Sequence, residues 1–255
     1  MTRTRIVVLA VVAAAVGAGW FAWRHARLGA PGGQRVSTVQ DTTRPRRGPV
    51  QPPKDAAEFA ARLRDPRWQV RAWAVGGLVR RQDIPTPERA RLVLEVLDRE
   101  VAAPTDAMIP AGSWPPFTNF LRIHYLHVLE QLGPDAAAPI RGALPARGGE
   151  AREWSVLALG AVGAADAAPE LRQLLARSTD ADVRMTAARY LGWLNDREAV
   201  PVLRAALADT ATATAVSDIV GRAPVRFYPV REQAAGALEQ LGMTVQRRGN
   251  TFSVQ

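Results

Sequence analysis

Five segments of the chain share a pattern in which an arginine is followed three positions later by a small or apolar residue and seven positions later by a leucine. The arginines of this pattern are Arg71, Arg122, Arg152, Arg184 and Arg231. The third position is held by Ala74, Tyr125, Ser155, Ala187 and Ala234, and the leucines are Leu78, Leu129, Leu159, Leu191 and Leu238. Successive arginines are 51, 30, 32 and 47 residues apart, which indicates a unit of about 31 residues with two insertions. Such self-similarity predicts a stack of small repeats, each burying its apolar face against its neighbours.

Apolar residues recur at three- and four-residue spacing from Asp55 onward, which predicts amphipathic helices. We expect five helix pairs, formed by residues 55–64 with 66–81, 87–101 with 118–132, 134–144 with 149–162, 165–177 with 180–194, and 196–208 with 228–241. Strand signals are absent before the last dozen residues. There Thr244–Arg248 and Thr251–Val254 flank Gly249-Asn250, a composition typical of a tight hairpin. Residues 244–255 are therefore predicted to form a small β-hairpin or, as the alternative, a frayed tail.

The fourth copy of the pattern, Asp180–Leu207, reads DADVRMTAARYLGWLNDREAVPVLRAAL. It resembles the HEAT-like repeats named after phycobilisome lyases, whose pattern runs D-x-x-V-R-x-x-A-x-x-x-L-G-x-L-x-D-x-x-A-x-x-x-L. The resemblance covers residues 55–243 and implies an all-α fold, a right-handed α-solenoid of about five HEAT-like helix pairs. It implies little about function, because this kind of repeat is defined by its architecture.

The repeated arginine has two interpretations. In the first it is structural and pairs with acids of its own or the adjacent repeat; Asp65, Asp180 and Asp182 lie just upstream of two of the arginines. In the second, the five arginines form a ladder that binds phosphates. We expect the structural role for all five.

The segment from Ile6 to Trp23 contains 18 residues without a charge and follows the basic tail 1–5. As a helix it would span about 27 Å, close to the hydrocarbon thickness of a bilayer. Trp20, Phe21 and Trp23 gather at one end, as aromatic rings do at membrane interfaces. Residues 6–23 are therefore predicted to be a transmembrane anchor. The main alternative is a signal peptide cleaved near residues 16–18, and a buried core helix is the least favoured reading.

Residues 24–54 are rich in Gly, Pro, Thr and Arg and have no apolar period, which predicts a linker. The arginines that flank residues 6–23 are balanced between the two sides, so charge alone does not orient the anchor. A basic tail as short as residues 1–5 is ordinarily retained in the cytoplasm. We therefore expect a single-pass protein of the cell membrane whose repeat domain is extracytoplasmic.

The formal net charge of +9 is carried by the ends of the chain. Residues 1–54 hold nine basic side chains and one acidic one, whereas residues 55–243 hold 22 basic and 23 acidic ones. A nearly neutral repeat domain does not indicate nucleic-acid binding, which favours a basic surface. The chain has no cysteine, which excludes disulfides and cysteine-ligated metal sites.

Motifs for catalysis are missing: the sequence has no Gly-rich phosphate loop, nucleophile elbow or paired-carboxylate motif. We therefore predict neither enzymatic activity nor a cofactor, and no small-molecule substrate is evident. His124 and His127 are three residues apart on one predicted helix, a spacing that suits a metal. Their only acidic neighbour in sequence is Glu130, so no metal site is predicted.

Two sets of residues are candidates for contact with a partner. The first is a row on the second helices, two residues after the repeat arginines or on the same face, and it comprises Trp73, His124, Trp154 and Trp193. The alternative is that these rings fill space between repeats. The second set lies in or beside the insertions 102–117 and 209–227 and comprises Trp114, Arg226, Phe227 and Tyr228. Because equivalent turns of a solenoid leave the same edge, both insertions are predicted to flank one rim, or else to be tolerated surface insertions.

These observations favour a non-enzymatic scaffold or adaptor that binds another protein and is tethered to a membrane. An accessory or maturation factor of the bilin-lyase kind, acting on a partner protein, is the first alternative, since the lyases share the repeat. A nucleic-acid-binding repeat protein is the second. A basic stripe on the folded surface would favour that last class.

Overall fold

The computed structural model describes residues 56–103, 119–215 and 225–254, and most of these residues are helical. The helices are α2 (Ala56–Leu63), α3 (Trp68–Leu78), α4 (Thr86–Ala102), α5 (Phe120–Leu132), α6 (Ala137–Ala143), α7 (Gly149–Ala161), α8 (Ala168–Arg177), α9 (Ala181–Trp193), α10 (Val200–Ala206) and α11 (Pro229–Gln240). Short 3-10 turns, η1 (Pro134–Ala136), η2 (Leu144–Ala146), η3 (Ala165–Ala167) and η4 (Arg197–Ala199), lie beside α6, α8 and α10. The five predicted helix pairs are confirmed.

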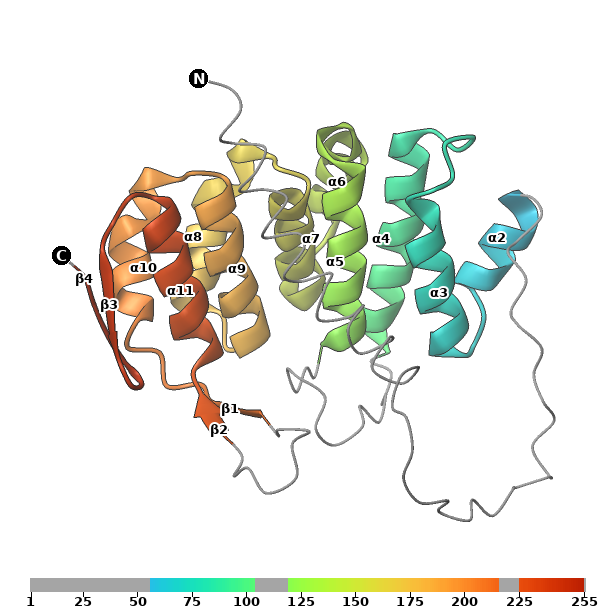
Figure 1. The fold of residues 1–255 in the computed structure, drawn as a ribbon. Helices are drawn as coiled ribbons and strands as arrows, with labels where there is room; N and C mark the ends of the chain where they lie inside the picture. The colour runs from blue at the N-terminus through green and yellow to red at the C-terminus, as the bar shows by residue number, and fades with distance from the viewer. Residues whose placement is uncertain (1–55, 104–118, 216–224, 255) are drawn as a thin grey trace, which may run out of the picture. The chain divides into compact units, whose positions relative to one another are not determined.

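The helices form two layers (Figure 1). The second helices of the pairs make an inner layer in which α3 contacts α5, α5 contacts α7, α7 contacts α9 and α9 contacts α11. The first helices α2, α4, α6, α8 and α10 make an outer layer, and each contacts the second helix of its own pair. We number the pairs as repeats one to five, from α2–α3 to α10–α11. This arrangement is the helical solenoid that the sequence repeat predicts.

The inner helices after α3 end in the same way. A residue with positive φ follows each of these four helices directly or one position later: Gly133 after α5, Gly163 after α7, Asn195 after α9 and Gly242 after α11. A left-handed residue after a helix turns the chain back and satisfies the last carbonyl groups. The outer helices α8 and α10 begin with Pro169 and Pro201, where a missing N–H costs no hydrogen bond. These signals explain why the sequence predicts the helix boundaries closely.

Glycine in the Leu-Gly step of the repeat lets neighbouring inner helices approach closely. A Cβ added to Gly192 of α9 would lie 2.8 Å from the Cα of Ala237 in α11. A Cβ added to Gly160 of α7 would lie 3.0 Å from the Cβ of Tyr190 in α9. The first distance is shorter than real Cβ contacts, so no larger residue fits at Gly192 without moving a helix.

Two short hairpins accompany the helices. Strands β3 (Val245–Arg248) and β4 (Thr251–Val254) pair antiparallel, with Val245 opposite Val254, as the residues around Gly249-Asn250 predict. Strands β1 (Ala213–Ala215) and β2 (Val225–Phe227) also pair antiparallel. The expectation that no strand precedes the last dozen residues is therefore wrong. Three-residue strands are too short for an alternating pattern to be recognised in the sequence.

The predicted anchor 6–23 and linker 24–54 lie outside the described residues. None of the helices that the structure does describe combines the length and the apolar character needed to cross a bilayer.

Candidate binding surface

The repeat arginines stabilise the turns between outer and inner helices through hydrogen bonds and ion pairs. Arg71 donates from Nη1 to the carbonyl oxygens of Asp65 and Pro66, both at 2.9 Å, and its Nη2 pairs with the carboxylate of Glu100 at the end of α4. Both side chains of this ion pair are buried. The guanidinium thus joins the turn of repeat one to the outer helix of repeat two.

Arg184 repeats this geometry in the fourth copy. Its Nη1 donates to the carbonyl oxygens of Ser178 and Thr179, at 2.9 and 3.1 Å, and its Nε lies 2.7 Å from Oδ2 of Asp209, beyond the end of α10. The structural interpretation of the arginines is supported in both copies, because the same two carbonyls five and six residues upstream are bound.

The other three arginines keep the role with different partners. Arg122 pairs with Glu150 and donates to the carbonyl oxygen of Glu100. Arg152 pairs with Glu170 at 2.7 Å. Arg231 donates to the carbonyl oxygens of Asp209 and Asn250.

The expectation that the arginines pair with acids of their own or the adjacent repeat is confirmed for four of the five. The acids just upstream have other partners. Asp65 accepts hydrogen bonds from Arg67 instead, and the side chain of Asp180 caps α9 by accepting from the backbone N–H of Asp182 at 2.8 Å. A short acidic side chain beside a helix start satisfies an unpaired backbone N–H, which competes with pairing to an arginine one or two turns on.

The position two residues after the arginine contacts the preceding repeat in repeats two and three. Nε2 of His124 lies 3.1 Å from the carbonyl oxygen of Ala72 in α3, and the guanidinium of Arg122 in α5 lies 5.3 Å from the ring centroid of Trp154 in α7. Trp154 is completely buried, which removes it from the candidate contact residues; His124 is largely buried as well. Trp73, in the first repeat, keeps 41% of its surface exposed.

Trp193, at the end of α9, is exposed as well, with 45% of its surface accessible, and Phe120 at the start of α5 is the third large exposed ring of the described inner layer. The guanidinium of Arg189 stacks 4.1 Å from the Trp193 ring centroid, and Tyr190 meets this indole edge-on at 5.7 Å. The sequence places Trp193 on one face with the buried Thr186, but its position at the C-terminal end of the helix leaves it in contact with solvent.

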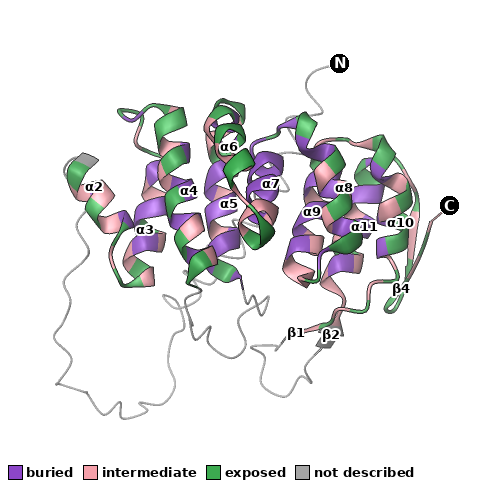
Figure 2. Ribbon diagram, turned by 180° about the vertical axis from the view of Figure 1, so that it is seen from behind, coloured by how far each residue is buried: buried purple, intermediate pink, exposed green. Residues whose placement is uncertain are grey.

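Side chains of α5 and α9 meet past α7 at two places. At the C-terminal end, Nη1 of Arg189 lies 2.8 Å from Nε2 of His127, while Nη2 of Arg189 and the hydroxyl of Tyr190 lie 3.2 and 2.9 Å from Glu130 Oε1. We call this cluster the α5–α9 bridge. Helix α7 lies between α5 and α9 in the order of repeats, and all its residues from Trp154 to Ala161 are buried (Figure 2).

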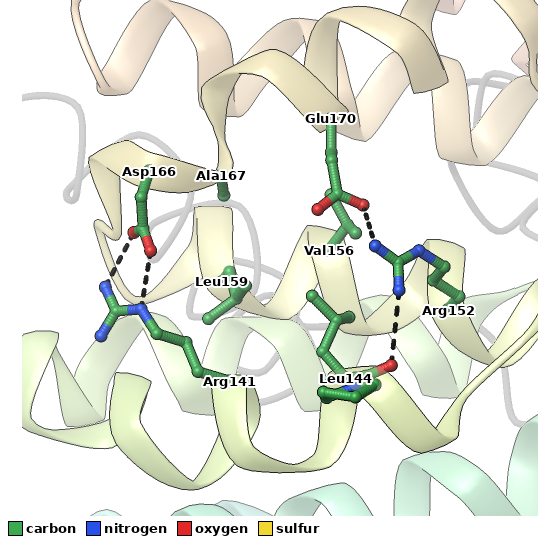
Figure 3. A pocket seen from close by; sticks show the side chains of 9 residues that line it. Arg141, Leu144, Arg152, Val156, Leu159, Asp166, Ala167 and Glu170 are labelled. Atoms are coloured by element: carbon green, nitrogen blue, oxygen red, sulfur yellow. Dashed lines mark hydrogen bonds and ion pairs between the residues drawn. The ribbon is translucent and has the colours of Figure 1, made fainter.

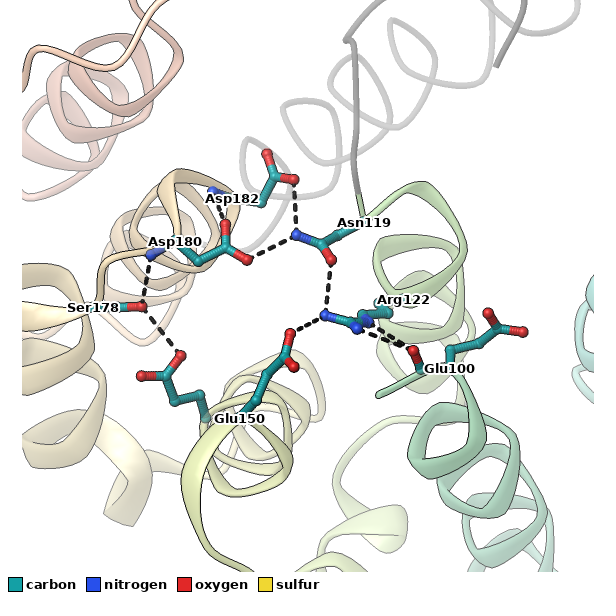
Figure 4. Close-up of polar contacts among 8 residues, drawn as sticks. Glu100, Asn119, Arg122, Glu150, Ser178, Asp180 and Asp182 are labelled. Atoms are coloured by element: carbon teal, nitrogen blue, oxygen red, sulfur yellow. Dashed lines mark hydrogen bonds and ion pairs between the residues drawn. The ribbon is translucent and has the colours of Figure 1, made fainter. Parts of the chain in front are cut away.

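The second meeting place lies where the inner helices begin (Figure 4). Nδ2 of Asn119 lies 2.8 Å from Oδ2 of Asp180 and 3.1 Å from Oδ2 of Asp182, while its Oδ1 accepts from Arg122. Asn119 precedes α5 and the two aspartates begin α9. The side chain of Asn119 therefore links repeat two directly to repeat four.

Burial shifts the pKa values of the groups that join α5 to α9. Burial and the neighbouring carboxylate of Asp180 raise the pKa of Asp182 to about 6, and burial raises the pKa of Glu130. Burial, followed by the charge of Arg189, lowers the pKa of His127 to about 4. His127 is therefore neutral near pH 7, and its Nε2 accepts a hydrogen bond from Nη1 of Arg189.

Residues 143–220 match the family model of HEAT repeats. The match covers α7 to α10, and it supports a HEAT-repeat protein. No curated protein matches the sequence.

The stack also has a cleft between repeats three and four that the sequence does not indicate (Figure 3). Its volume is about 300 Å³, and Val156 and Leu159 of α7 contribute apolar surface. The ion pairs Arg141–Asp166 and Arg152–Glu170, each at 2.7 Å, stand at its sides. Arginine and acid are already paired at both places, so the cleft offers no free charge to a ligand.

The insertions lie in part outside the described residues, as do Trp114 and the side chain of Arg226. Their described ends lie at the edge of the stack where the inner helices begin. Asn119 contacts the start of α9, and Arg184 and Arg231 both bind Asp209. The described ends of both insertions therefore lie at one edge, as the repeat geometry predicts. Phe227 and Tyr228 are half-buried, and the guanidinium of Arg231 covers the Tyr228 ring at 3.8 Å.

Among the residues that the structure describes, no three His, Asp or Glu side chains are gathered as metal ligands. His124 and His127 face different partners, the carbonyl oxygen of Ala72 and the guanidinium of Arg189.

Proposed function

We propose that this HEAT-repeat protein is a non-enzymatic scaffold or adaptor that binds another protein through the surface around Trp193. HEAT solenoids commonly present extended surfaces to protein partners. The observation that carries the proposal is the exposed Trp193 ring stacked on Arg189. Tryptophan and arginine are the residues most enriched at the energetic centres of protein interfaces.

The α5–α9 bridge supports this choice, because it fixes the surface before a partner arrives. Arg189 stacks on Trp193 while its guanidinium nitrogens contact His127 and Glu130. A ring and a guanidinium already held in place lose little conformational entropy when they are covered, which favours binding.

A protein partner is preferred to a nucleic acid because the repeat arginines are already engaged. Four of the five pair with carboxylates: Arg71 with Glu100, Arg122 with Glu150, Arg152 with Glu170 and Arg184 with Asp209. A phosphate ladder requires guanidinium groups free to exchange counterions for phosphates. The nearly neutral charge of residues 55–243 points the same way.

We further propose that residues 6–23 tether the repeats to the cell membrane as a single span, with the repeats of the phycobilisome-lyase type on the extracytoplasmic side. The support is the uncharged 18-residue segment behind a short basic tail. Alkaline phosphatase fused after Gln255 is expected to be active. An inactive fusion, together with an active cytoplasmic reporter at the same position, would reverse the topology.

The partner surface is tested with a photo-crosslinking amino acid placed in the full-length chain in its native membrane. At position 193 it is expected to give a discrete adduct with another protein, and Arg189→Ala is expected to weaken that adduct. The matched control is position 73, whose tryptophan is equally exposed but lies at the far end of the inner layer. Equal labelling of the same protein from both positions would argue against a defined surface at Trp193.

A further inference from the structure

The face of α3 that carries Trp73 corresponds to a surface that is half-buried in repeat two and buried in repeats three and four. In α5 and α7 the residue at this position, two after the arginine, contacts the preceding inner helix: His124 contacts α3, and Trp154 lies beneath Arg122 of α5. In α9 the equivalent Thr186 is buried. Among the residues that the structure describes, no repeat precedes the first, and Trp73 is 41% exposed. The Trp73 ring therefore lies on an inter-repeat face against which the described residues place no further repeat.

The charges around Trp73 are balanced, which favours a protein helix over a phosphate-bearing surface. The guanidinium of Arg62 lies 5.4 Å from the Trp73 ring centroid and pairs with Glu58 at 2.6 Å. Three further cations of repeat one are paired too: Arg64 with Glu95, Arg67 with Asp65 and Arg81 with Asp83. A large ring among neutralised charges resembles the core of a protein interface.

The opposite end of the stack is covered. Hairpin β3–β4 follows α11, and Met243, Val245 and Val254 pack against the hydrophobic core. Arg247 ties the hairpin to Glu239 of α11, and Arg231 holds the carbonyl oxygen of Asn250 at its tip. This cap prevents a second copy from continuing the stack head to tail, since α11 offers no open inter-repeat face.

We propose that the Trp73 face, formed by α3 with Arg62 of α2, binds the same face of a second copy of this chain. An interface that uses one patch twice closes as a two-fold dimer, whereas a head-to-tail contact would propagate into a filament. Within one chain, α3 packs against another inner helix, α5. In the proposed dimer, the Trp73 face of α3 packs against a further inner helix, the α3 of the second copy. The dimer interface thus continues the inter-repeat interface. This inference is independent of the partner surface around Trp193.

The test uses the absence of cysteine from the chain. The full-length variant Gln69→Cys keeps Trp73 and places a thiol on an exposed position of α3 one helical turn before it. The variant is purified in detergent and treated with a short bismaleimide cross-linker at low protein concentration, and it is expected to migrate predominantly as a species of twice the chain mass. The matched control is Trp193→Cys, whose thiol lies away from the proposed interface and is expected to yield no cross-linked species. Cross-linking of Gln69→Cys no stronger than that of the control overturns the proposal.

Mass measurement by light scattering provides the complement without a cross-linker. Wild type and Trp193→Ala are expected to be dimers, Trp73→Ala a monomer at the same concentration, and Trp73→Phe a dimer. A dimeric Trp73→Ala variant overturns the proposal. Failure of partner labelling at position 193 leaves these masses unchanged, so the two proposals fail separately.

Other occupants of the face give different results. If residues 6–23 covered it, a double variant with cysteines at Trp73 and Val12 would cross-link within one chain and yield a monomeric band. If another protein covered it, a photo-crosslinker at position 73 would give an adduct whose mass exceeds the chain by something other than one chain mass. Either result contradicts the dimer.

Discussion

Trp73 and Trp154 occupy the same position of the repeat, two residues after its arginine, at the end and in the middle of the stack. One ring is 41% exposed beside Arg62, and the other is completely buried between its neighbours. Helix α7 contacts inner helices on both sides, whereas α3 contacts only α5 in its layer. The place of a repeat in the stack therefore decides whether the same residue is a core residue or a surface one. Variants at the centre and at the end are expected to behave differently.

The largest effect is expected from Trp154→Ala, which empties a completely buried site. Loss of an indole from a core typically lowers the free energy of unfolding by about 3–5 kcal/mol. Trp154→Phe is expected to cost less, because Nε1 of Trp154 has no hydrogen-bond partner among the described residues. Urea denaturation followed by circular dichroism measures both variants. A loss below about 1 kcal/mol for Trp154→Ala would show that the centre is not a packed core.

Arg184→Ala is expected to lower the free energy of unfolding by roughly 1–3 kcal/mol, because it leaves two carbonyl groups and Asp209 without their donor. Partner labelling from position 193 is expected to persist. A variant that melts like wild type but loses the partner would make the arginines a binding device.

Gly192→Ala is expected to destabilise the centre by roughly 1–3 kcal/mol, because the added methyl group would meet the backbone of Ala237. Gly142→Ala in α6 is the matched control, since an added Cβ there meets no atom within 4 Å. The control is expected to be neutral or slightly stabilising, as alanine favours helices. Comparable melting temperatures for the two variants would contradict the close approach of α9 and α11.

Asp182→Asn tests the link between Asn119 and α9 through its pH dependence. The pKa of Asp182 is raised to about 6 in the folded protein, so the folded state binds the proton more tightly than the unfolded state. The contribution of Asp182 to stability therefore grows as the pH falls from 7 through 6 towards 4. Asp182→Asn is expected to remove this gain, which is on the order of 1 kcal/mol. A melting-temperature difference between variant and wild type that is constant from pH 7 to pH 5 would contradict the shift.

The smallest effect on unfolding is expected from Trp73→Ala. Removal of an exposed ring at the end of the stack eliminates few packing contacts. The free energy of unfolding of the monomer should therefore fall by about 0.5 kcal/mol or less. The measurement is made at a protein concentration below that at which the dimer forms. A loss as large as that of Trp154→Ala would show that end and centre are equivalent after all.

The sequence predicts the elements of the stack well, because apolar spacing, the repeated arginine and the glycines after inner helices are all local signals. It does not predict the α5–α9 bridge, since Glu130 and Arg189 lie 59 residues apart and belong to no shared pattern. It also does not separate Trp73 from Trp154, whose local patterns are alike. The cleft beside Val156 is not predicted either, because its walls come from two repeats and no local pattern brings them together.

The α5–α9 bridge has a consequence for how the protein unfolds. In a solenoid whose repeats touch only their neighbours, each repeat opens with its own intrinsic stability and the ends fray inward. Tyr190 and Arg189 reach past α7 to Glu130, and Asn119 does the same at the other edge. Opening α9 therefore also breaks contacts of α5, which couples repeats two to four into one cooperative unit. Amide hydrogen exchange should then show a single slow rate class across α5, α7 and α9, and faster exchange in α2 and α3.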